Sequence, residues 1–396
     1  MDLQLSVEHE DFRDTVSDFL ISNKPAWPES GLGLQHARRL TWQKMLIENG
    51  YAARTIAKEY GGYGAEPDIL KSRLIAEAFA KTGAPPPTAN QGVSMLVPTL
   101  LENGTEEQKQ QWVGSTLRGE TIWCQGYSEP GSGSDLASLR TAAVLEGDEY
   151  VINGQKIWTS TARQADMIFC LVRTDPEAPK HGGISYLIFS MDTPGIEIRP
   201  LVDMTGSANF NEVFFTDVRV PKDQIVGEPG QGWRVANSTL KHERGMLGNP
   251  NAAKARLLAI VELMKTESID GERMMDSPIF RDRLIKLQAE VYAMQANGMR
   301  VTTASLKGES AGMAGLIIKL QGCELNHQLA GLANDVMGEL GLLYGDTSRI
   351  RDGGSWQWRF MYDLGLIIGG GTAQIQKNII SERGLGMPRE PKAMTA

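Results

Sequence analysis

Residues 125–135 read Gln-Gly-Tyr-Ser-Glu-Pro-Gly-Ser-Gly-Ser-Asp, a run of small, hydroxyl-bearing and turn-forming residues. Such a run can present backbone N–H groups and side-chain donors to a planar polar ring or to a phosphate. By composition alone it is more typical of a long surface turn, because glycine, proline, aspartate and serine dominate turns. The segments on either side of it, and their order, decide between the two interpretations.

The residues before this run have a helical pattern. Apolar side chains recur at helical spacing over residues 7–20, where Ser6 is suited to cap the first turn. The same spacing returns over residues 37–49, 69–81 and 106–117, with glycine- or proline-rich segments between them. We predict an all-helical N-terminal domain over residues 1–120.

The residues after the run have the character of a sheet. Short segments rich in β-branched and aromatic residues occur at 142–145, 149–152, 167–173, 184–190, 196–199 and 212–220. The turn signals Glu146-Gly147-Asp148 and Asn153-Gly154 supply the positive φ that hairpins need. We predict a central antiparallel β-barrel over residues 121–232.

The remainder of the chain returns to a helical composition. Segments rich in alanine, leucine and methionine cover residues 236–265, 281–305, 311–343 and 375–383. No period of 20 to 50 residues recurs, which excludes a solenoid. We predict a C-terminal helical domain of the four-helix type over residues 233–396, so that the fold class is multi-domain, with helices, then a sheet, then helices.

Bulk composition excludes several classes of function. The chain has 396 residues, a net charge of -8 and no run of basic residues, which argues against nucleic-acid binding. No segment has the roughly 20 consecutive apolar residues of a membrane span, and the N-terminus is not a secretory signal. Three widely spaced cysteines fit buried thiols in a reducing compartment, so we expect a cytoplasmic protein.

Familiar site motifs are missing from the sequence. The five histidines have no metal-ligand spacing with one another or with cysteine, so we expect no metal site. The sequence contains no P-loop and no strand followed by Gly-x-Gly-x-x-Gly. A nucleotide cofactor must therefore be bound in another way.

Four blocks in their order along the chain resemble the acyl-CoA dehydrogenase family. They are the run at 125–135, Asn-Gly-Gln-Lys-Ile-Trp-Thr-Ser at 153–160, Phe-Thr-Asp-Val-Arg-Val-Pro at 215–221 and Gly-Glu-Pro-Gly-Gln-Gly-Trp at 227–233. The resemblance extends to residues 60–64 and 371–376 and so covers essentially the whole chain. It implies a helical domain, a β-barrel domain and a second helical domain that enclose FAD, in tetramers built from dimers.

The resemblance also implies which residues contact the cofactor. The residues that stand where the family contacts the flavin are Gln125, Tyr127, Ser128 and Ser134, with Trp158 and Ser160 beside the isoalloxazine ring. Those that stand where the family reaches the adenosine half are Thr372 and Gln374, with Gly338, Glu339 and Gly341 in a glycine-rich turn that serves a neighbouring subunit's cofactor. Taken alone, a tryptophan is more often a core residue than the wall of a cofactor site.

The chemistry needs a carboxylate that removes the α-proton of the thioester while the β-hydrogen leaves as hydride. In many members of the family a glutamate near the C-terminus does this, but Gly370 occupies that position here. Leu240-Lys241-His242-Glu243-Arg244 resembles the alternative motif of the isovaleryl and long-chain branches, which makes Glu243 the candidate base. Without the resemblance, Glu243 and Arg244 would be read as charges on a solvated helix face. Ser134 and Arg244 are the candidates for contacts with the substrate.

Two departures from the family pattern bear on the substrate. Residues 273–276 only partly match the motif whose arginine reaches the pyrophosphate, and Glu339 replaces a glycine of the adenosine turn. Both features resemble bacterial members that act on steroid side chains, dicarboxylates or aromatic acyl groups. Because Gly370 has no side chain, we hypothesise room for a branched or ring-bearing acyl chain.

Other functions remain open at this point. The same scaffold serves flavin monooxygenases, nitroalkane oxidases and desulfinases, and a fold does not fix a function. The chain could also be an inactive subunit of a heteromeric dehydrogenase, but such a subunit is expected to lose the base or the flavin contacts, and this chain retains both. A pure binding protein is a further alternative. As partners the resemblance implies an acyl-CoA substrate, electron-transferring flavoprotein, and either a homotetramer or a heterotetramer with a homologous subunit.

Overall fold

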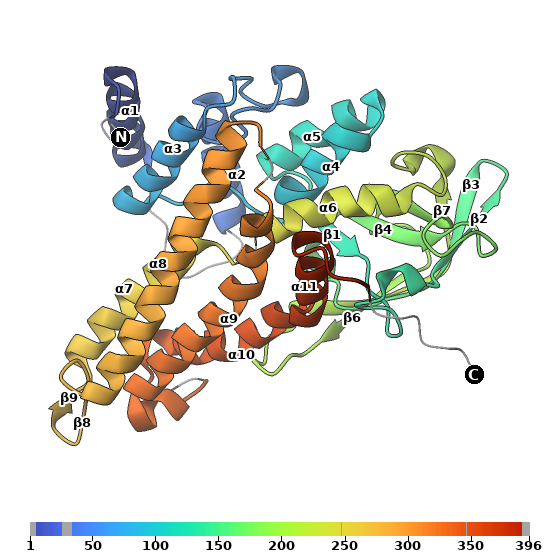
Figure 1. Ribbon diagram of the computed structural model, residues 1–396. Coiled ribbons are helices and arrows are strands. Elements are labelled where there is room, and N and C mark those ends of the chain that lie inside the picture. The colour runs from blue at the N-terminus through green and yellow to red at the C-terminus, as the bar shows by residue number, and fades with distance from the viewer. Residues whose placement is uncertain (1–4, 26–33, 247, 310, 346, 390–396) are drawn as a thin grey trace. The chain divides into compact units, whose positions relative to one another are not determined.

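The computed structural model in Figure 1 describes residues 5–25, 34–246, 248–309, 311–345 and 347–389. The side chains of residues 34–38, 244–246 and 305–306 lie outside this description. Internal contacts divide the chain into two compact units: Met1–Leu201 with Asn209–Thr239, and Val202–Ala208 with Leu240–Ala396. The first unit contains both the N-terminal helices and the sheet. The predicted domain boundaries after residues 120 and 232 stay predictions.

The N-terminal part of the first unit is helical, as predicted. Its helices are α1 (Val7–Asn23), α2 (Leu34–Glu48), α3 (Ile69–Thr82), α4 (Val97–Asn103) and α5 (Glu106–Arg118). The Ser6 side chain caps α1 by accepting from the backbone N–H of His9. Thr105 and Gln108 form a reciprocal capping box at the start of α5, which satisfies N–H groups that a helix leaves unpaired. The sequence pattern did not predict the short helix α4.

The sheet of the first unit follows directly. Its strands are β1 (Trp123–Gly126), β2 (Ala142–Glu146), β3 (Glu149–Lys156), β4 (Met167–Arg173), β5 (Ile184–Ser190), β6 (Ile196–Leu201) and β7 (Phe210–Pro221). They are ordered β1-β4-β2-β3-β7-β6, with β5 paired to β4. The apolar segments β4 and β5 are buried at six of their seven positions, which is typical of strands covered on both faces.

Two details of the sheet differ from the sequence prediction. β1 and β2 both run parallel to β4, whereas the other pairings of the described strands are antiparallel. The long connection between β1 and β4 permits a parallel pairing that a tight turn does not. Gly147 lies in the β2–β3 turn with φ +64°, but Asn153-Gly154 lies inside β3 rather than in a turn. Gly154 is needed there because a Cβ atom would lie 2.7 Å from the Cα of Thr141.

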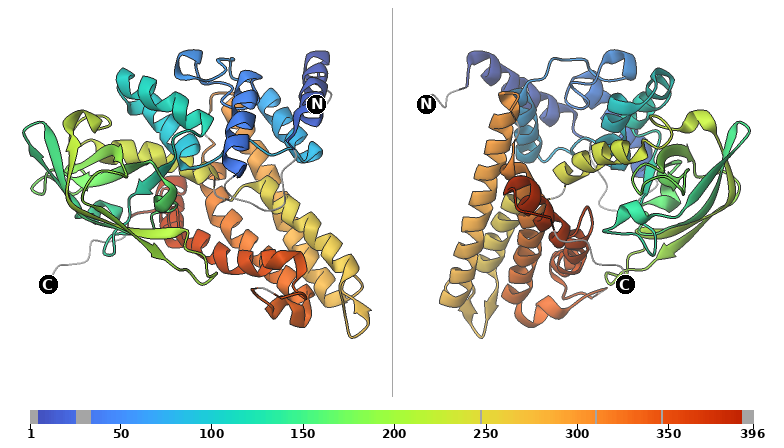
Figure 2. Two further views of the ribbon diagram at one scale, coloured as in Figure 1. Left: turned by 180° about the vertical axis from the view of Figure 1, so that it is seen from behind. Right: turned by 45° about the vertical axis from the view of Figure 1, so that its right-hand side comes forward.

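The second unit is a helical bundle with a hydrophobic core. Its helices are α7 (Pro250–Thr266), α8 (Pro278–Leu306), α9 (Met313–Val336), α10 (Ser355–Ile368) and α11 (Ala373–Ile379), with a small β8 (Ser268–Ile269) and β9 (Glu272–Arg273) hairpin after α7. Helix α9 packs against α7, α8 and α10, and Figure 2 shows the bundle from two further sides. Buried core residues include Leu257, Val291, Leu329 and Trp356, one from each of these helices.

The bundle departs from the sequence prediction in two places. The helix predicted over 236–265 is two helices, because α6 (Gly232–Met246) ends before Gly248, which has φ +75°. A Cβ atom on Gly248 would lie 2.4 Å from the carbonyl oxygen of Ile318 in α9, so this close approach requires glycine. Helix α10 was not predicted, and the helix expected over 311–343 ends as α9 at Val336.

The predicted fold class is confirmed as an N-terminal helical part, a middle half-barrel sheet and a C-terminal helical part. Among the described residues, no helix combines the length and the apolar character that crossing a membrane requires.

Core packing gives a test of the second unit. Leu329 on α9 is fully buried, so Leu329→Ala should lower the free energy of unfolding by about 2–5 kcal/mol through lost burial and a residual cavity. Leu258→Ala on α7 removes a side chain that is 56% exposed and should change it by less than about 0.5 kcal/mol. Urea unfolding followed by circular dichroism measures both, and equal losses would contradict this description of the core.

Candidate active site

The loop after β1 contains the residues that the sequence places beside a flavin. Gln125 is the third residue of β1 and is partly buried. The ring of Tyr127 is 5% exposed and packs edge-on against Phe169 of β4, so this residue can offer a ligand its backbone groups rather than its ring. Ser128 is partly exposed and Ser134 is exposed, which leaves both hydroxyl groups near the surface of the loop.

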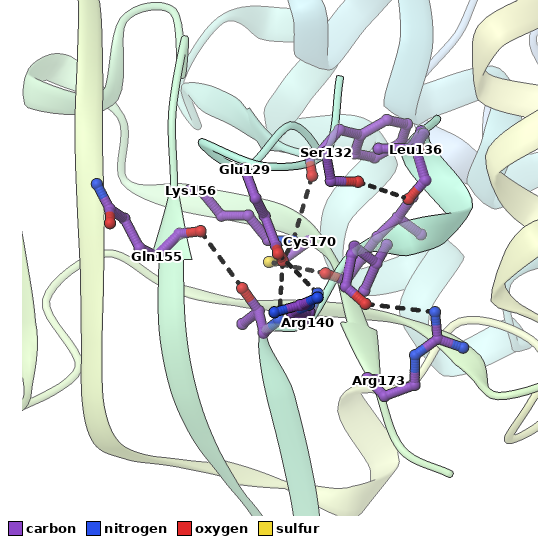
Figure 3. A network of polar contacts seen from close by, with 12 residues as sticks. Glu129, Ser132, Leu136, Arg140, Gln155, Lys156, Cys170 and Arg173 are labelled. Atoms are coloured by element: carbon purple, nitrogen blue, oxygen red, sulfur yellow. Dashed lines mark hydrogen bonds and ion pairs between the residues drawn. The ribbon is translucent and has the colours of Figure 1, made fainter. Parts of the chain in front are cut away.

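A buried ion pair joins this loop to the end of β3, as Figure 3 shows. Lys156 Nζ lies 2.8 Å from Glu129 Oε1 and donates a second hydrogen bond of 3.2 Å to the carbonyl oxygen of Tyr127. The Lys156 side chain is 0% exposed and that of Glu129 is 9% exposed. The Glu129 carboxylate also accepts from the backbone N–H groups of Arg140 and Thr141, at 2.6 and 2.8 Å. Each charge is therefore compensated by several polar partners.

The contacts of Glu129 determine its ionisation. Burial opposes the charged form, but the positive charge and hydrogen bond of Lys156 and the hydrogen bonds from Thr141 and Arg140 outweigh it. Together they hold the pKa of the Glu129 carboxyl below its usual value of 4.5. Glu129 is therefore a structural carboxylate at neutral pH and is unsuited to act as a general base.

The far end of the loop is fixed from the neighbouring strand β4. The Arg173 guanidinium donates to the carbonyl oxygens of Ala137 and Leu139, at 2.6 and 3.3 Å. The hydroxyl of Ser132 donates to the carbonyl oxygen of Asp135 inside the loop. The loop is thus ordered by internal and external hydrogen bonds rather than being an irregular surface turn.

Trp158 has an unusual combination of backbone strain and exposure. Its φ is +61°, which is rare for a residue with a side chain, and the indole is 58% exposed. The ring contacts Phe210 edge-on, with 6.0 Å between ring centroids. Strained residues persist where the surrounding structure fixes them and cluster at ligand sites. An exposed apolar ring held in this way is suited to lie against a planar ligand.

The residue after Trp158 provides a test of fit for the expected flavin. Thr159 is fully buried, and its Oγ1 has no hydrogen-bond partner among the described residues. Buried polar groups rarely stay unpaired, so such an atom indicates a missing partner. The backbone here is otherwise satisfied, because Thr159 and Asn211 exchange hydrogen bonds of 3.0 and 2.9 Å. An exposed indole beside a buried hydroxyl fits a ligand that has an aromatic face and a polar edge.

Helix α6 carries the candidate base Glu243. The first part of the helix is anchored in the first unit, where Thr239 Oγ1 lies 2.9 Å from Thr99 Oγ1 and 3.4 Å from the hydroxyl of Tyr186. Glu243 follows Thr239 by four residues and so lies on the same helix face. Its side chain is partly buried, unlike the charges of a fully solvated face. The side chain of Arg244 lies outside the described residues.

The glycine turn before α11 is fixed by a buried lysine. Lys319 of α9 is 2% exposed and donates to the carbonyl oxygens of Ile367 and Gly371, at 3.1 and 2.6 Å. Gly370 has φ +65°, a conformation in which a glutamate would be strained. The turn conformation therefore agrees with glycine at this position. Thr372 caps α11 through the N–H of Ile375, and Gln374 is exposed on the first turn of that helix.

The second unit contains a hollow of about 820 Å³ beside the turn with Gly338 and Gly341. Its wall includes Asn334 and Gln357, whose buried side-chain carbonyl oxygens have no hydrogen-bond partner among the described residues. Gly341 permits a close approach, because a Cβ atom there would lie 2.2 Å from the carbonyl oxygen of Asn334. A ligand with hydrogen-bond donors fits these two acceptors.

The structure groups the predicted residues into sets within each unit. In the first unit the hydrogen bond from Ile157 N to the carbonyl oxygen of Ser128, 2.9 Å long, brings the loop beside the Trp158 segment. The second unit contains the Glu243, Gly338 and Thr372 positions. Arg273 is the arginine of the segment that partly matches the pyrophosphate motif. It forms an exposed ion pair with Asp276.

Sequence reasoning missed several residues that shape these segments. They are Glu129, Lys156, Thr159 and Lys319. One signal could have found Lys156: it has the same alternation phase as Tyr150 and Ile152, which are buried in β3. A lysine at an inward position needs a buried partner. Among the described residues there is no group of three or more histidine, cysteine, aspartate or glutamate side chains arranged to hold a metal ion.

The lowered pKa of Glu129 predicts an acid-sensitive contribution to stability. A carboxyl whose pKa is lower in the folded than in the unfolded state stabilises the fold above its unfolded value. That contribution is lost as the pH falls through the folded value. The difference in unfolding free energy between the native chain and Glu129→Gln should therefore be constant near neutral pH and shrink below about pH 4.5. Denaturant unfolding across this pH range measures this difference, with the exposed Glu262→Gln as the control. The same pH dependence of the unfolding free energy in both variants would contradict the assignment.

Comparison with known proteins accounts for nearly the whole chain. Residues 6–120 match the N-terminal domain of acyl-CoA dehydrogenases, residues 124–218 the middle domain and residues 230–385 the C-terminal domain. The chain is 38% identical over 371 residues to acyl-CoA dehydrogenase IpdE1 of Mycobacterium tuberculosis. The aligned region covers 91% of this chain and 92% of the relative.

Solved structures lead to the same family. A steroid ACAD, Tcur3481-Tcur3483, superposes with a TM-score of 0.81 at 30% identity and covers 98% of this chain and 100% of its own. The ChsE4-ChsE5 complex from Mycobacterium tuberculosis superposes with a TM-score of 0.80 at 30% identity, with the same coverage of 98% and 100%. Three matched domains in order, together with these relatives, show that the chain belongs to the acyl-CoA dehydrogenase family, whose members are FAD-dependent oxidoreductases.

Proposed function

We propose that this enzyme oxidises an acyl-CoA thioester to the 2-enoyl-CoA, with Glu243 as the base. The observation that carries the proposal is a partly buried glutamate in the Leu-x-x-Glu-Arg motif of α6, while Gly370 stands in a turn unsuited to a glutamate. Family membership supplies the reaction class, and these two positions support Glu243 as the carboxylate that carries it out.

The proposed chemistry gives each group one task. The Glu243 carboxylate takes the α-proton of the thioester, and the electrons of that C–H bond form the new double bond between the α and β carbons. Bound FAD supplies the acceptor for the β-hydrogen, which leaves with both electrons of its bond. Partial burial suits a carboxylate base, because removal of water makes it a better proton acceptor. Ser134 and Arg244 are the proposed substrate contacts.

The proposed flavin contacts lie in two segments of the first unit that the ion pair and a backbone hydrogen bond join. They are Gln125, Tyr127, Ser128, Ser134, Trp158 and Ser160. The strained exposed indole of Trp158 and the unpaired Thr159 hydroxyl support a flavin at this place. For the adenosine half we propose Thr372 and Gln374, and for a neighbouring subunit's cofactor Gly338 and Gly341, whose hollow offers two unpaired acceptors.

An assembly of two different chains is a second possibility that specific findings favour. The two solved structures compared above are named as pairs, Tcur3481-Tcur3483 and ChsE4-ChsE5. We therefore propose either a homotetramer or a heterotetramer in which this chain is the active half, since it retains Glu243. We propose electron-transferring flavoprotein as the acceptor of the electrons. The free cysteines Cys124, Cys170 and Cys323 are all buried, which supports our expectation of a reducing, cytoplasmic compartment.

The acyl group is proposed to be branched or ring-bearing. Glycine at position 370 leaves space where the family commonly has a glutamate, and one structurally similar protein, Tcur3481-Tcur3483, is a steroid ACAD. The oxidation would then belong to the β-oxidation of a steroid side chain or of a similarly bulky acyl chain.

Replacement of the base gives the first test of this function. Glu243→Gln should retain bound FAD but reduce the rate of flavin bleaching by acyl-CoA by about 10²- to 10⁴-fold, because the amide cannot accept the α-proton. Anaerobic stopped-flow measurement of flavin absorbance checks this, and mass spectrometry of the product checks the loss of two hydrogens. Glu262→Gln, an exposed glutamate of α7, is the matched control. Normal bleaching by Glu243→Gln would remove Glu243 from the reaction.

The acyl preference gives a second test. In an anaerobic panel of acyl-CoA thioesters, those with a ring-bearing or branched bulky acyl chain should bleach the flavin with a higher kcat/KM than isobutyryl-CoA. The physical reason is the volume that glycine leaves free at position 370. Isobutyryl-CoA as the best substrate of the panel would overturn the proposed class.

A further inference from the structure

The ion pair between Lys156 and Glu129 lies between the two segments proposed to contact the flavin. Lys156 is the last residue of β3 and directly precedes the segment that contains Trp158. Glu129 directly follows Ser128 in the loop after β1. Neither charged residue is among the proposed flavin contacts, so the pair has no role in the function as described so far.

The hydrogen bonds around this pair connect the loop and the strand residue by residue. Lys156 Nζ donates to the carbonyl oxygen of Tyr127 at 3.2 Å and to Glu129 Oε1 at 2.8 Å. Between them, the backbone N–H of Ile157 donates to the carbonyl oxygen of Ser128 at 2.9 Å. Three consecutive loop residues are therefore bound by Lys156, the last residue of β3, and by Ile157 directly after it. This arrangement fixes the position of the loop along the strand.

The pair also fixes the start of β2. Glu129 Oε1 and Oε2 accept from the backbone N–H groups of Thr141 and Arg140, the two residues before that strand. Figure 3 shows the carboxylate at the centre of these contacts. One side chain thus connects the loop, β2 and β3, and Lys156 supplies the charge that keeps the carboxylate ionised in a buried place.

Stability alone is a weak explanation for such a pair. Taking two charges out of water is costly, and well-packed apolar residues often replace a buried ion pair without loss of stability. A buried pair does, however, fix geometry, because its charges tolerate few alternative arrangements. The segment next to it needs fixed geometry, since Trp158 is held at φ +61° with its ring 58% exposed.

We propose that Lys156 is a positioning residue that, through Glu129 and the carbonyl groups of the loop, sets the relative placement of Ser128 and Trp158 at the flavin site. The inference rests on the proposed function, because it takes these residues as flavin contacts. Lys156 does not touch the reacting atoms. Its role is to make the site ready for the ring before FAD binds, so that little binding energy is lost in ordering the loop.

The test compares two lysine variants, each of which removes an ion pair to a carboxylate of the loop after β1. Lys156→Met keeps an unbranched side chain, one heavy atom shorter than lysine, and removes the buried charge. Lys180→Met removes an exposed ion pair of 2.5 Å between Lys180, in the connection from β4 to β5, and Asp135 of the loop. Titration of apoprotein with FAD should give a dissociation constant raised about 10-fold or more for Lys156→Met, as for other groups that orient direct ligands, and within twofold of native for Lys180→Met. The visible circular dichroism of bound flavin should change only for Lys156→Met.

Saturation with FAD separates positioning from simple loss of cofactor. Fully loaded Lys156→Met should retain a KM for acyl-CoA close to native while kcat falls by up to about 10²-fold, because a small misplacement of reacting groups costs rate more than binding. An FAD dissociation constant and a kcat both within twofold of native would overturn the proposal.

A double variant separates positioning from stability. Lys156→Met with Glu129→Gln leaves no unpaired charge, so its thermal stability should recover relative to Lys156→Met, while its FAD affinity should stay low. Recovery of stability and FAD affinity together would show a purely structural role and overturn the proposal.

The role of Lys156 can still be tested if Lys156→Met fails to fold or if the proposed reaction does not occur. If Lys156→Met does not fold, Glu129→Gln decides: its amide group places a donor against the N–H of Arg140, so a native FAD affinity would overturn the proposal. If the native chain binds FAD but no acyl-CoA bleaches it, the proposed reaction fails, while the FAD titrations still decide the role of Lys156.

Discussion

The placement of the loop after β1 in the first unit depends on the burial of one ammonium group. An unpaired charge in a protein interior is so unfavourable that it would lose its proton or unfold its surroundings. Lys156 is fully buried at the end of β3, so Glu129 and the carbonyl oxygen of Tyr127 must lie beside it. This requirement brings the loop after β1 and the beginning of β2 to the same point.

The second unit uses the same physical solution for a different loop. Lys319 of α9 is buried and donates to carbonyl oxygens at the end of α10 and in the glycine turn that follows. Both loops lie outside regular ladders of hydrogen bonds, so their carbonyl groups need other donors. A lysine on a strand or a helix supplies them from a rigid support. In each unit a segment proposed to bind the cofactor or the substrate is thus fixed by a buried lysine that is not itself a proposed contact of either.

Local sequence rules fail where function is proposed. Trp158 has a backbone conformation that favours glycine, its large apolar ring is exposed, and the hydroxyl of Thr159 is buried without a partner among the described residues. Gly370 is the opposite case, because its conformation matches its residue type but departs from the glutamate common in the family. Natural proteins tend to break local rules at functional sites and to compensate elsewhere. The ion pair and the backbone hydrogen bonds around Trp158 are such a compensation.

The sequence predicted the order of helices, sheet and helices, because periodic burial of apolar residues follows from local geometry. It also predicted the candidate residues, through motifs whose order resembles one family. It did not predict α10, whose aromatic and branched residues after Gly353 and Gly354 have no clear helical signal. It read 236–265 as one helix, because the close approach of α9 that requires Gly248 is a tertiary contact.

The sequence by itself thus determined the family, the succession of elements and a list of candidate positions. Only the tertiary structure decided that Tyr127 turns its ring into the core, that Trp158 is strained and exposed, and that Lys156 pairs with Glu129 across 27 positions of the chain. The physical reason is that burial and electrostatic compensation depend on which residues meet in space. Local pattern shows that a lysine faces inward, but only the fold supplies the carboxylate that makes its burial possible.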